Sequence, residues 1–257
     1  MQSKTDGKPG RRTRIIANLL VVITAVWLLV YLMPAGRAMM LDAALSFALG
    51  LLVTGLLWWA VYESVPSRCF WTWLAAAWTV GLLGNIAWGL YELLSGTALP
   101  PLSWVDGFYL VRYALVLVAF WRCLGVPARR QWLHFLGVLL VAAAAAAVGA
   151  LLTVPASRLT IVNLSGVFYA VLDLGLIYVA LRAWWQEPAG GLRNALGLLS
   201  LALVAYGIAN WLNFFGQAIP SDTAVHLAAF FWPLSDILTS AGVLHLLWTA
   251  DSAASAS

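Results

Sequence analysis

The stretch VHLAAFFWPLSDILTSAGVLHLLWT, residues 225–249, is long and apolar enough to cross a membrane, yet it carries Asp236 near its middle. A membrane-spanning helix needs about 20 predominantly apolar residues. An aspartate at the centre of such a helix costs roughly 2.5–3.5 kcal/mol on insertion scales, and it seldom faces lipid. Pro233 has no N–H group to donate, so we expect a bent helix that presents Asp236 to the interior of a helical bundle.

Apolar runs of this kind recur along the whole chain. Of its 257 residues, 63% are hydrophobic and only 9% are charged, whereas a soluble domain carries about 25% charged residues. Because hydrocarbon supplies no water to satisfy backbone groups, each run should be helical. The sequence therefore predicts an all-α polytopic membrane protein. Eight transmembrane helices are expected, at about 15–33, 41–62, 70–94, 104–124, 132–153, 161–185, 193–215 and 225–249.

The positions of the basic residues predict the orientation of these helices. Cytoplasmic segments of membrane proteins carry an excess of Lys and Arg. With the N-terminus inside, the outer loops hold only Arg37 and Arg158, and Arg112 lies within a span. The cytoplasmic segments then hold Lys4, Lys8, Arg11, Arg12, Arg14, Arg68, Arg122, Arg129, Arg130, Arg182 and Arg193. This distribution favours four hairpins with both termini in the cytoplasm.

Three regions follow from this arrangement. We expect a basic cytoplasmic tail over 1–14, an eight-helix transmembrane domain over 15–250 and a disordered tail over 251–257. The net charge of +4 comes largely from the first tail, which we interpret as an anchor to the lipid surface and not as a nucleic-acid site. A cleaved signal peptide is the alternative for the first span, but its apolar run of about 19 residues exceeds the usual length.

Four aspartates recur at intervals of about 65 residues, namely Asp42, Asp106, Asp173 and Asp236. Each lies on a predicted helix that runs from outside to inside. The interval corresponds to two membrane helices with their loops, so we interpret the pattern as a hairpin repeated in one orientation.

Other polar and aromatic residues fall on the same helical faces as these aspartates, at spacings of three, four or seven residues. The simplest packing turns these stripes toward one another and forms a polar, aromatic-walled pocket that opens outward. Such residues can also serve only as hydrogen-bonding contacts between helices. The predicted site comprises Asn85, Trp88, Glu92, Asp106, Tyr109, Arg112, Tyr113, Tyr169, Asp173, Asn210, Asn213, Trp232 and Asp236. We expect Arg112 to pair with a central aspartate or with Glu92.

Several classes of chemistry lack their residues in this sequence. Both lysines lie in the N-terminal tail, which excludes a retinal Schiff base inside the membrane. The chain has no HExxH, CxxC or GxSxG motif and no phosphate-binding glycine loop. Cys69 and Cys123 both fall at predicted cytoplasmic ends, so we expect neither a disulfide nor a metal site. No cofactor and no catalytic residue is predicted.

Two neighbouring segments, GNIAWGLYE at 84–92 and PLSWVDGFYLVRY at 101–113, resemble the multi-span N-terminal membrane region of bacterial diguanylate cyclases. The similarity covers roughly residues 70–250, and Ala170 stands where the pattern favours proline. The matching positions are Asn85, Trp88, Tyr91, Glu92, Ser103, Asp106, Tyr109, Leu110 and Tyr113, followed by Asp173 and Asp236 in later helices.

The resemblance implies a sensor-like module in the bacterial inner membrane. Because the chain ends soon after the eighth span, we expect no cyclase domain and a signal that passes to a cytoplasmic partner. The first hypothesis is therefore a sensor that binds a small apolar or amphipathic ligand. An intramembrane lipid hydrolase of the lysoplasmalogenase kind and a proton-coupled transporter are the alternatives.

Overall fold

The computed structural model describes residues 11–32, 35–63, 65–97, 99, 103–126, 131–153, 161–218 and 222–254, and these residues form helices and short connections without a strand. Eight α-helices follow one another in this part of the chain, and a π-helical turn, η1, continues α4. Their bounds are α1 Arg11–Tyr31, α2 Ala35–Tyr62, α3 Arg68–Ser95, α4 Asp106–Val118, η1 Ala119–Cys123, α5 Trp132–Thr153, α6 Ile161–Gln186, α7 Gly191–Ala218 and α8 Asp222–Ala254.

Six of these helices, α1, α2, α3, α6, α7 and α8, are long and apolar enough to cross a membrane. Of the other two, α4 has 13 residues and is lengthened by the five of η1. The second, α5, contributes the shorter apolar stretch Trp132–Ala145. The expectation of an all-helical, multi-pass membrane protein is thereby confirmed, and such helices would be in contact with a lipid bilayer.

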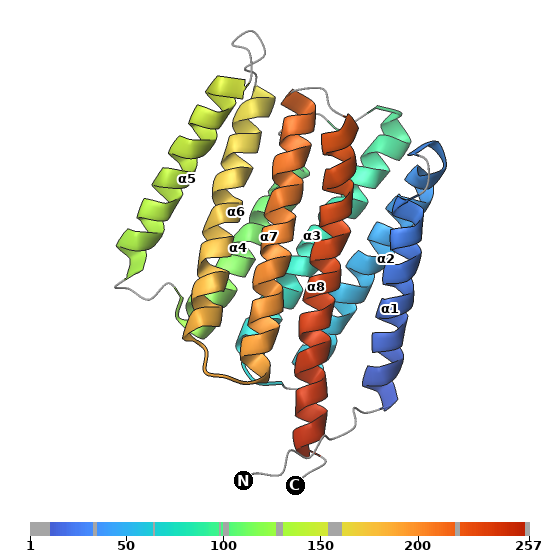
Figure 1. Cartoon of the computed structure of the whole chain (residues 1–257), viewed down its shortest axis with the longest axis vertical. Coiled ribbons are helices and arrows are strands. Elements are labelled where there is room, and N and C mark those ends of the chain that lie inside the picture. The colour runs from blue at the N-terminus through green and yellow to red at the C-terminus, as the bar shows by residue number, and fades with distance from the viewer. Residues whose placement is uncertain are drawn as a thin grey trace.

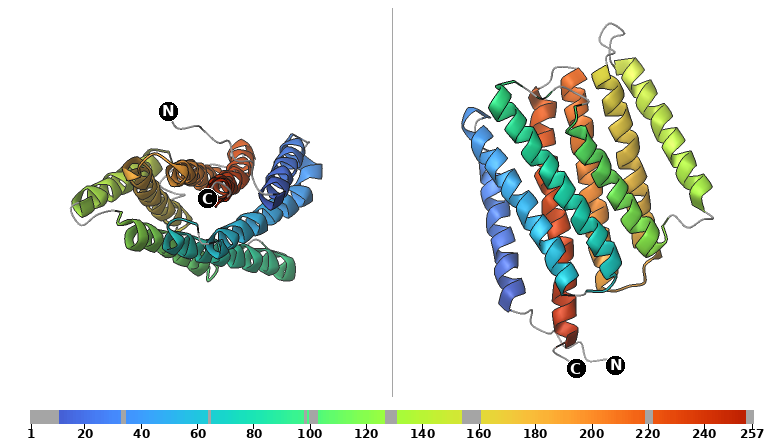
Figure 2. Two further views of the ribbon diagram at one scale, coloured as in Figure 1. Left: turned by 90° about the horizontal axis from the view of Figure 1, so that it is seen from below. Right: turned by 180° about the vertical axis from the view of Figure 1, so that it is seen from behind.

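The helices alternate in direction along the chain (Figure 1). Six of them form a closed ring, in which the contacts run from α2 to α3, α4, α6, α7, α8 and back to α2 (Figure 2, left). Outside the ring, α1 packs against α2 and α8, whereas α5 packs against α6. The contact between α7 and α8 is the most extensive in the ring, and that between α4 and α6 is the sparsest.

Small residues explain why α7 and α8 lie so close together. Ala202 and Ala209 of α7 are completely buried. At Gly242 of α8 an added Cβ atom would meet the backbone oxygen of Ala195 at 3.1 Å. In lipid, where helices gain nothing by hiding apolar surface from water, such close backbone approach supplies much of the attraction between helices.

One end of the bundle is basic. The described part of α1 begins there and that of α8 ends there (Figure 1). The starts of α3 and α7 and the ends of η1 and α6 lie at the same end, so the arginines of these segments gather at it. We call it the basic end, and its described arginines are Arg12, Arg14, Arg68, Arg122, Arg182 and Arg193.

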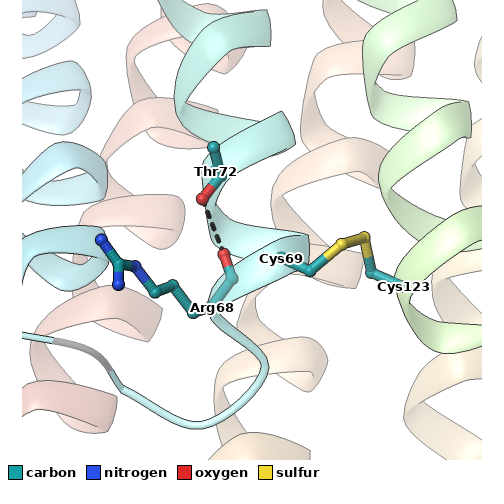
Figure 3. Close-up of a disulfide and its surroundings, with 4 residues drawn as sticks. All are labelled: Arg68, Cys69, Thr72 and Cys123. Atoms are coloured by element: carbon teal, nitrogen blue, oxygen red, sulfur yellow. Dashed lines mark hydrogen bonds between the residues drawn. A yellow bond between two sulfur atoms is a disulfide. The ribbon is translucent and has the colours of Figure 1, made fainter.

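A disulfide joins Cys69, in the first turn of α3, to Cys123, the last residue of η1 (Figure 3). The expectation of no disulfide was therefore wrong. The cysteines are 54 residues apart, and no spacing rule predicts a bridge from that separation. They meet because α3 and α4 are antiparallel neighbours, which places the start of one beside the end of the other, with Cα atoms 5.7 Å apart.

Other sequence predictions fall partly outside the described residues. Most of the basic tail, residues 1–10, and the last three residues lie outside them, as does the side chain of Asp42. The other three periodic aspartates lie on α4, α6 and α8, which run in one direction (Figure 1). Pro233 lies inside α8, which is helical on both sides of it, and the bend there stays a prediction.

The close contact between α7 and α8 can be tested with two glycines. We predict that Gly242→Val lowers the unfolding temperature in detergent by at least about 4 °C, because overpacking costs about 1–3 kcal/mol. Gly55→Val is the matched control, since no atom lies within 4 Å of a Cβ atom added at this exposed position. Equal unfolding temperatures for the two variants in a thermal melt would contradict the packing described for α8.

Candidate functional site

A hydrogen-bonded network surrounds Asp173, which lies on α6 with 4% of its surface exposed. The hydroxyl of Tyr113 on α4 donates to one carboxylate oxygen at 2.5 Å. The amide of Asn210 on α7 donates to the other at 2.9 Å and approaches the Tyr113 hydroxyl at 3.1 Å. Trp232 on α8 donates its indole N–H to the Asn210 carbonyl at 3.0 Å. Four helices of the ring thus contribute to one network.

The network offsets the cost of placing a carboxylate where water is scarce. A buried charge is tolerated only when it is paired or accepts several hydrogen bonds. Asp173 accepts bonds at both oxygens from neutral donors, and those donors are held in turn by their own partners. Gly207 of α7 makes room for this contact, because a Cβ atom there would lie 3.3 Å from that of Asp173. Such fully satisfied networks favour a single arrangement of the helices.

Arg112, on α4, lies beside this network between two aromatic rings. Its guanidinium carbon is 4.6 Å from the ring centroid of Trp78 on α3 and 4.6 Å from that of Tyr206 on α7. Gly81 leaves the space for it, since a Cβ atom there would lie 2.8 Å from the Arg112 side chain. Contacts of a cation with two aromatic faces stabilise charge inside the membrane. Among the described residues, the guanidinium has neither a hydrogen-bond partner nor an ion pair within 4 Å.

Asp236, near the middle of α8, is joined to this arginine through Trp78. The indole N–H of Trp78 donates to Asp236 at 3.2 Å while its ring faces Arg112. Asp236 and Arg112 also attract each other electrostatically without direct contact. In place of the expected direct pairing of Arg112 with a carboxylate, the structure shows an aromatic bridge, in which Trp78 contacts both charged groups.

A second group of the predicted residues lies toward the end opposite the basic end. Asp106, the first residue of α4, accepts bonds from the Tyr169 hydroxyl of α6 at 2.6 Å and from the backbone N–H of Ser103 at 2.7 Å. Tyr109 donates to the Asn85 side chain at 2.8 Å. The Trp88 ring lies edge-on to that of Tyr109, with centroids 6.5 Å apart.

The structure does not gather every predicted residue around one space. Asn85 and Trp88 are exposed on the half of α3 that lies away from the basic end, as is Glu92, which accepts a weak bond from the backbone N–H of Leu99 at 3.4 Å. Asn213 is half-buried, about one turn beyond Asn210 on α7. The remaining members connect α4, α6, α7 and α8 through their hydrogen bonds and ring contacts. Glu92, which is the alternative partner of Arg112 in the sequence prediction, forms no ion pair with it.

A small cavity lies where the Asp173 network meets Arg112 and its two aromatic rings. Its volume of about 10 Å³ is close to the least space in which one water molecule fits. Arg112 and the aromatic residues give this wall hydrogen-bond donors beside apolar surface. The lining residues are Trp78, Arg112, Tyr113, Val116, Leu176, Leu203 and Tyr206.

Among the aromatic residues of this wall, the predicted site omitted Trp78 and Tyr206. Helical spacing contained a signal for both. Trp78 precedes Asn85 by seven residues, and Tyr206 precedes Asn210 by four, so each shares a face with a predicted site residue. No group of three or more His, Cys, Asp or Glu side chains suited to a metal occurs in the described part of the chain.

Comparison of the chain with protein-family models, with curated proteins and with solved structures gives no match. The function is therefore proposed from the contacts of the Asp173 network and of the Arg112 group, which we together call the polar core. Its residues are Trp78, Arg112, Tyr113, Asp173, Tyr206, Asn210, Trp232 and Asp236.

The bridging role of Trp78 leads to a stability prediction. We expect Trp78→Phe to lower the free energy of unfolding in detergent by about 1–2 kcal/mol, because Asp236 loses a donor and Arg112 faces a ring that attracts cations less strongly. Trp73→Phe, at an exposed position on the same helix, should change it by less than about 0.5 kcal/mol.

A second substitution separates this bridge from simple loss of packing. Asp236→Asn removes the charge that Trp78 solvates, so Trp78→Phe should cost less in the Asp236→Asn background than in the wild-type protein. Equal costs in the two backgrounds, measured by denaturant unfolding, would show that the indole N–H does not act on Asp236.

Proposed function

We propose that the chain is a sensor-like module of the bacterial inner membrane, which binds a small amphipathic molecule in the polar core and signals through a cytoplasmic partner. Its eight helices would all span the bilayer as four hairpins, with both termini in the cytoplasm. The basic end of the bundle supports this orientation, because positive residues concentrate on the cytoplasmic side of membrane proteins. The motifs shared with the diguanylate cyclase membrane regions support the class of function.

The observation that carries the proposal is the state of Arg112. Its guanidinium faces are covered by Trp78 and Tyr206, while its edge has no hydrogen-bond partner among the described residues. Guanidinium N–H groups form a planar fork that matches a carboxylate or phosphate. The Arg112 side chain is half-buried, so its N–H groups keep donor capacity that an acceptor group from a ligand would satisfy. We therefore propose a ligand with an acidic head group and an apolar tail.

The cavity is too small for such a ligand while the ring is closed, so binding requires a wider state. The sparse contact between α4 and α6 is the place where the ring opens most easily. Two reciprocal hydrogen bonds cross this boundary, from Tyr113 to Asp173 and from Tyr169 to Asp106. Separating α4 from α6 would join the cavity to the hydrocarbon, where the tail of an amphipathic molecule already resides.

The same geometry connects the site to the basic end. A ligand that binds only the open state shifts the population toward it. In that state α4 moves relative to α6, and Arg112 moves relative to the Trp78–Asp236 pair on α3 and α8. Since α8 and η1 both end at the basic end, a partner there could read the displacement.

A proton-coupled carrier is the second candidate, because two carboxylates, Asp173 and Asp236, accept hydrogen bonds from Tyr113 and Trp78, which line a water-sized cavity. Carboxylates in the interior of membrane proteins commonly relay protons. The carrier predicts proton or substrate flux into liposomes that Asp173→Asn abolishes, whereas the sensor predicts no flux. A lipid hydrolase, the remaining alternative, predicts product from lipid in detergent.

The ligand class can be tested with a photoactivatable fatty acid. Palmitic acid with a diazirine in its chain should label the wild-type protein in nanodiscs on α4, α6 or α7, and unlabelled palmitate should compete. We expect Arg112→Gln to reduce labelling at these helices at least tenfold, because the head group loses its bidentate partner. Peptide mass spectrometry locates the label.

Two controls make the result specific. Arg122→Gln removes an exposed arginine of the same chain segment and should leave the labelling unchanged. The corresponding diazirine alcohol, which lacks the acidic head, should label the core weakly in both proteins. Labelling that is confined to the lipid-facing surface and that Arg112→Gln does not alter would overturn the proposal.

A further inference from the structure

The Cys69–Cys123 disulfide lies at the basic end, where α3 starts and η1 ends (Figure 3). Arg68 and Arg122 directly precede the two cysteines in the sequence. By the rule that positive residues mark the cytoplasmic side, this end faces a compartment in which thiol reductants keep most cysteines reduced. A permanent disulfide is not expected there, whereas a transient, regulatory one is.

Exposure makes the bridge accessible to such reductants. Cys69 is exposed and Cys123 is half-buried, so an incoming thiolate reaches the Cys69 sulfur first. That route leaves the sulfur of Cys123 as the leaving group. Thiol–disulfide exchange requires this kind of access, in addition to a thiolate in the attacking molecule.

Aromatic packing joins α3 to η1 beside the disulfide. Phe70 follows Cys69 directly, and Phe120 lies three residues before Cys123. Both rings are fully buried and pack edge-to-face with centroids 5.1 Å apart. The ring of Trp71 packs on Phe70, and its indole N–H donates to the Pro66 carbonyl at 3.0 Å. Because this aromatic packing remains after reduction, opening the disulfide should release a local constraint and leave the fold intact.

The constraint acts on the helix that carries the polar core. Cys123 ends a π-helical turn that continues α4, and the same helix bears Arg112 and Tyr113 eleven and ten residues earlier. Isolated π-helical turns are rare and occur frequently at functional sites. Tying the last residue of this turn to α3 fixes the end of α4, and releasing it allows the turn to rearrange.

From these observations we propose that Cys69 and Cys123 form a reversible thiol–disulfide exchange site, which controls the mobility of η1 and the adjoining end of α4. Its reaction partner is a cytoplasmic thiol, either a small monothiol or a protein dithiol. This inference does not depend on the ligand proposed for the polar core.

Reduction of the Cys69–Cys123 disulfide consists of two successive thiol–disulfide exchange steps. A thiolate attacks the Cys69 sulfur, the protein S–S bond breaks, and a mixed disulfide forms while Cys123 leaves as a thiolate that takes up a proton. A second thiolate then attacks the external sulfur of the mixed disulfide and releases Cys69 as a thiol. The protein disulfide gains two electrons, and the reductant becomes a disulfide. Oxidation by a disulfide reagent runs the same steps in reverse.

The redox state can be measured in intact cells that express the full chain. Acid quenching followed by a size-tagged maleimide should show two reduced cysteines before treatment, none after the thiol oxidant diamide, and two again after recovery. A membrane-impermeant maleimide should not label them until the cells are lysed. Three outcomes would overturn the proposal: a disulfide that persists in untreated cells, cysteines that diamide never oxidises, or labelling of intact cells by the impermeant reagent.

The effect on α4 is measured on the purified protein in nanodiscs. Amide hydrogen exchange over 114–126 should be at least fivefold faster in the reduced than in the oxidised protein, with an unchanged rate over the α7–α8 contact. The Cys69→Ser/Cys123→Ser variant should behave like the reduced protein with or without diamide. Equal exchange rates in both redox states would refute the control of η1. Unfolding on reduction would also contradict the proposal, because the disulfide would then be required for the stability of the fold.

Discussion

Charged side chains inside a membrane need partners, because hydrocarbon solvates neither a carboxylate nor a guanidinium, and the arrangement of this bundle follows from that need. The described core holds two aspartates and one arginine away from both ends of the helices. Their partners come from different helices: Tyr113 and Asn210 for Asp173, and Trp78 for Asp236. A helix that turned its polar face toward lipid would lose these partners, so the network favours one orientation of each helix in the ring.

The two aspartates are accommodated in different ways, and this difference bears on function. Asp173 has neutral donors at both carboxylate oxygens and is nearly sealed from its surroundings. Asp236 relies on one indole donor and on the charge of Arg112 beyond it. The first arrangement links α4, α6 and α7 by hydrogen bonds, and its Tyr113–Asp173 bond would have to break for α4 to separate from α6. The second leaves a cation with unused donors beside a cavity, and we propose that a ligand supplies the acceptor.

Periodicity in the sequence predicted the helices and most of the residues in the core. Apolar runs of membrane length located the helices, and helical spacing placed Tyr113, Asp173, Asn210 and Asp236 on inward faces. Helical spacing does not specify the distance between residues on different helices. The placement of Trp78 between Arg112 and Asp236 therefore escaped prediction, as did the exposure of Asn85. The disulfide was missed for a related reason, because the compartment argument against it says nothing about how close two cysteines lie in the fold.

The central claim is that polar groups from separate helices share one interior, and the most direct test is the coupling between Tyr113 and Asp173. Unfolding free energies of the wild-type protein, Tyr113→Phe, Asp173→Asn and the double variant give this coupling as their departure from additivity. We predict a coupling of about 1 kcal/mol, in the range of interhelical hydrogen bonds in membranes. Additive effects, with a coupling indistinguishable from zero, would mean that the two side chains do not meet, and the account of a shared polar core would fail.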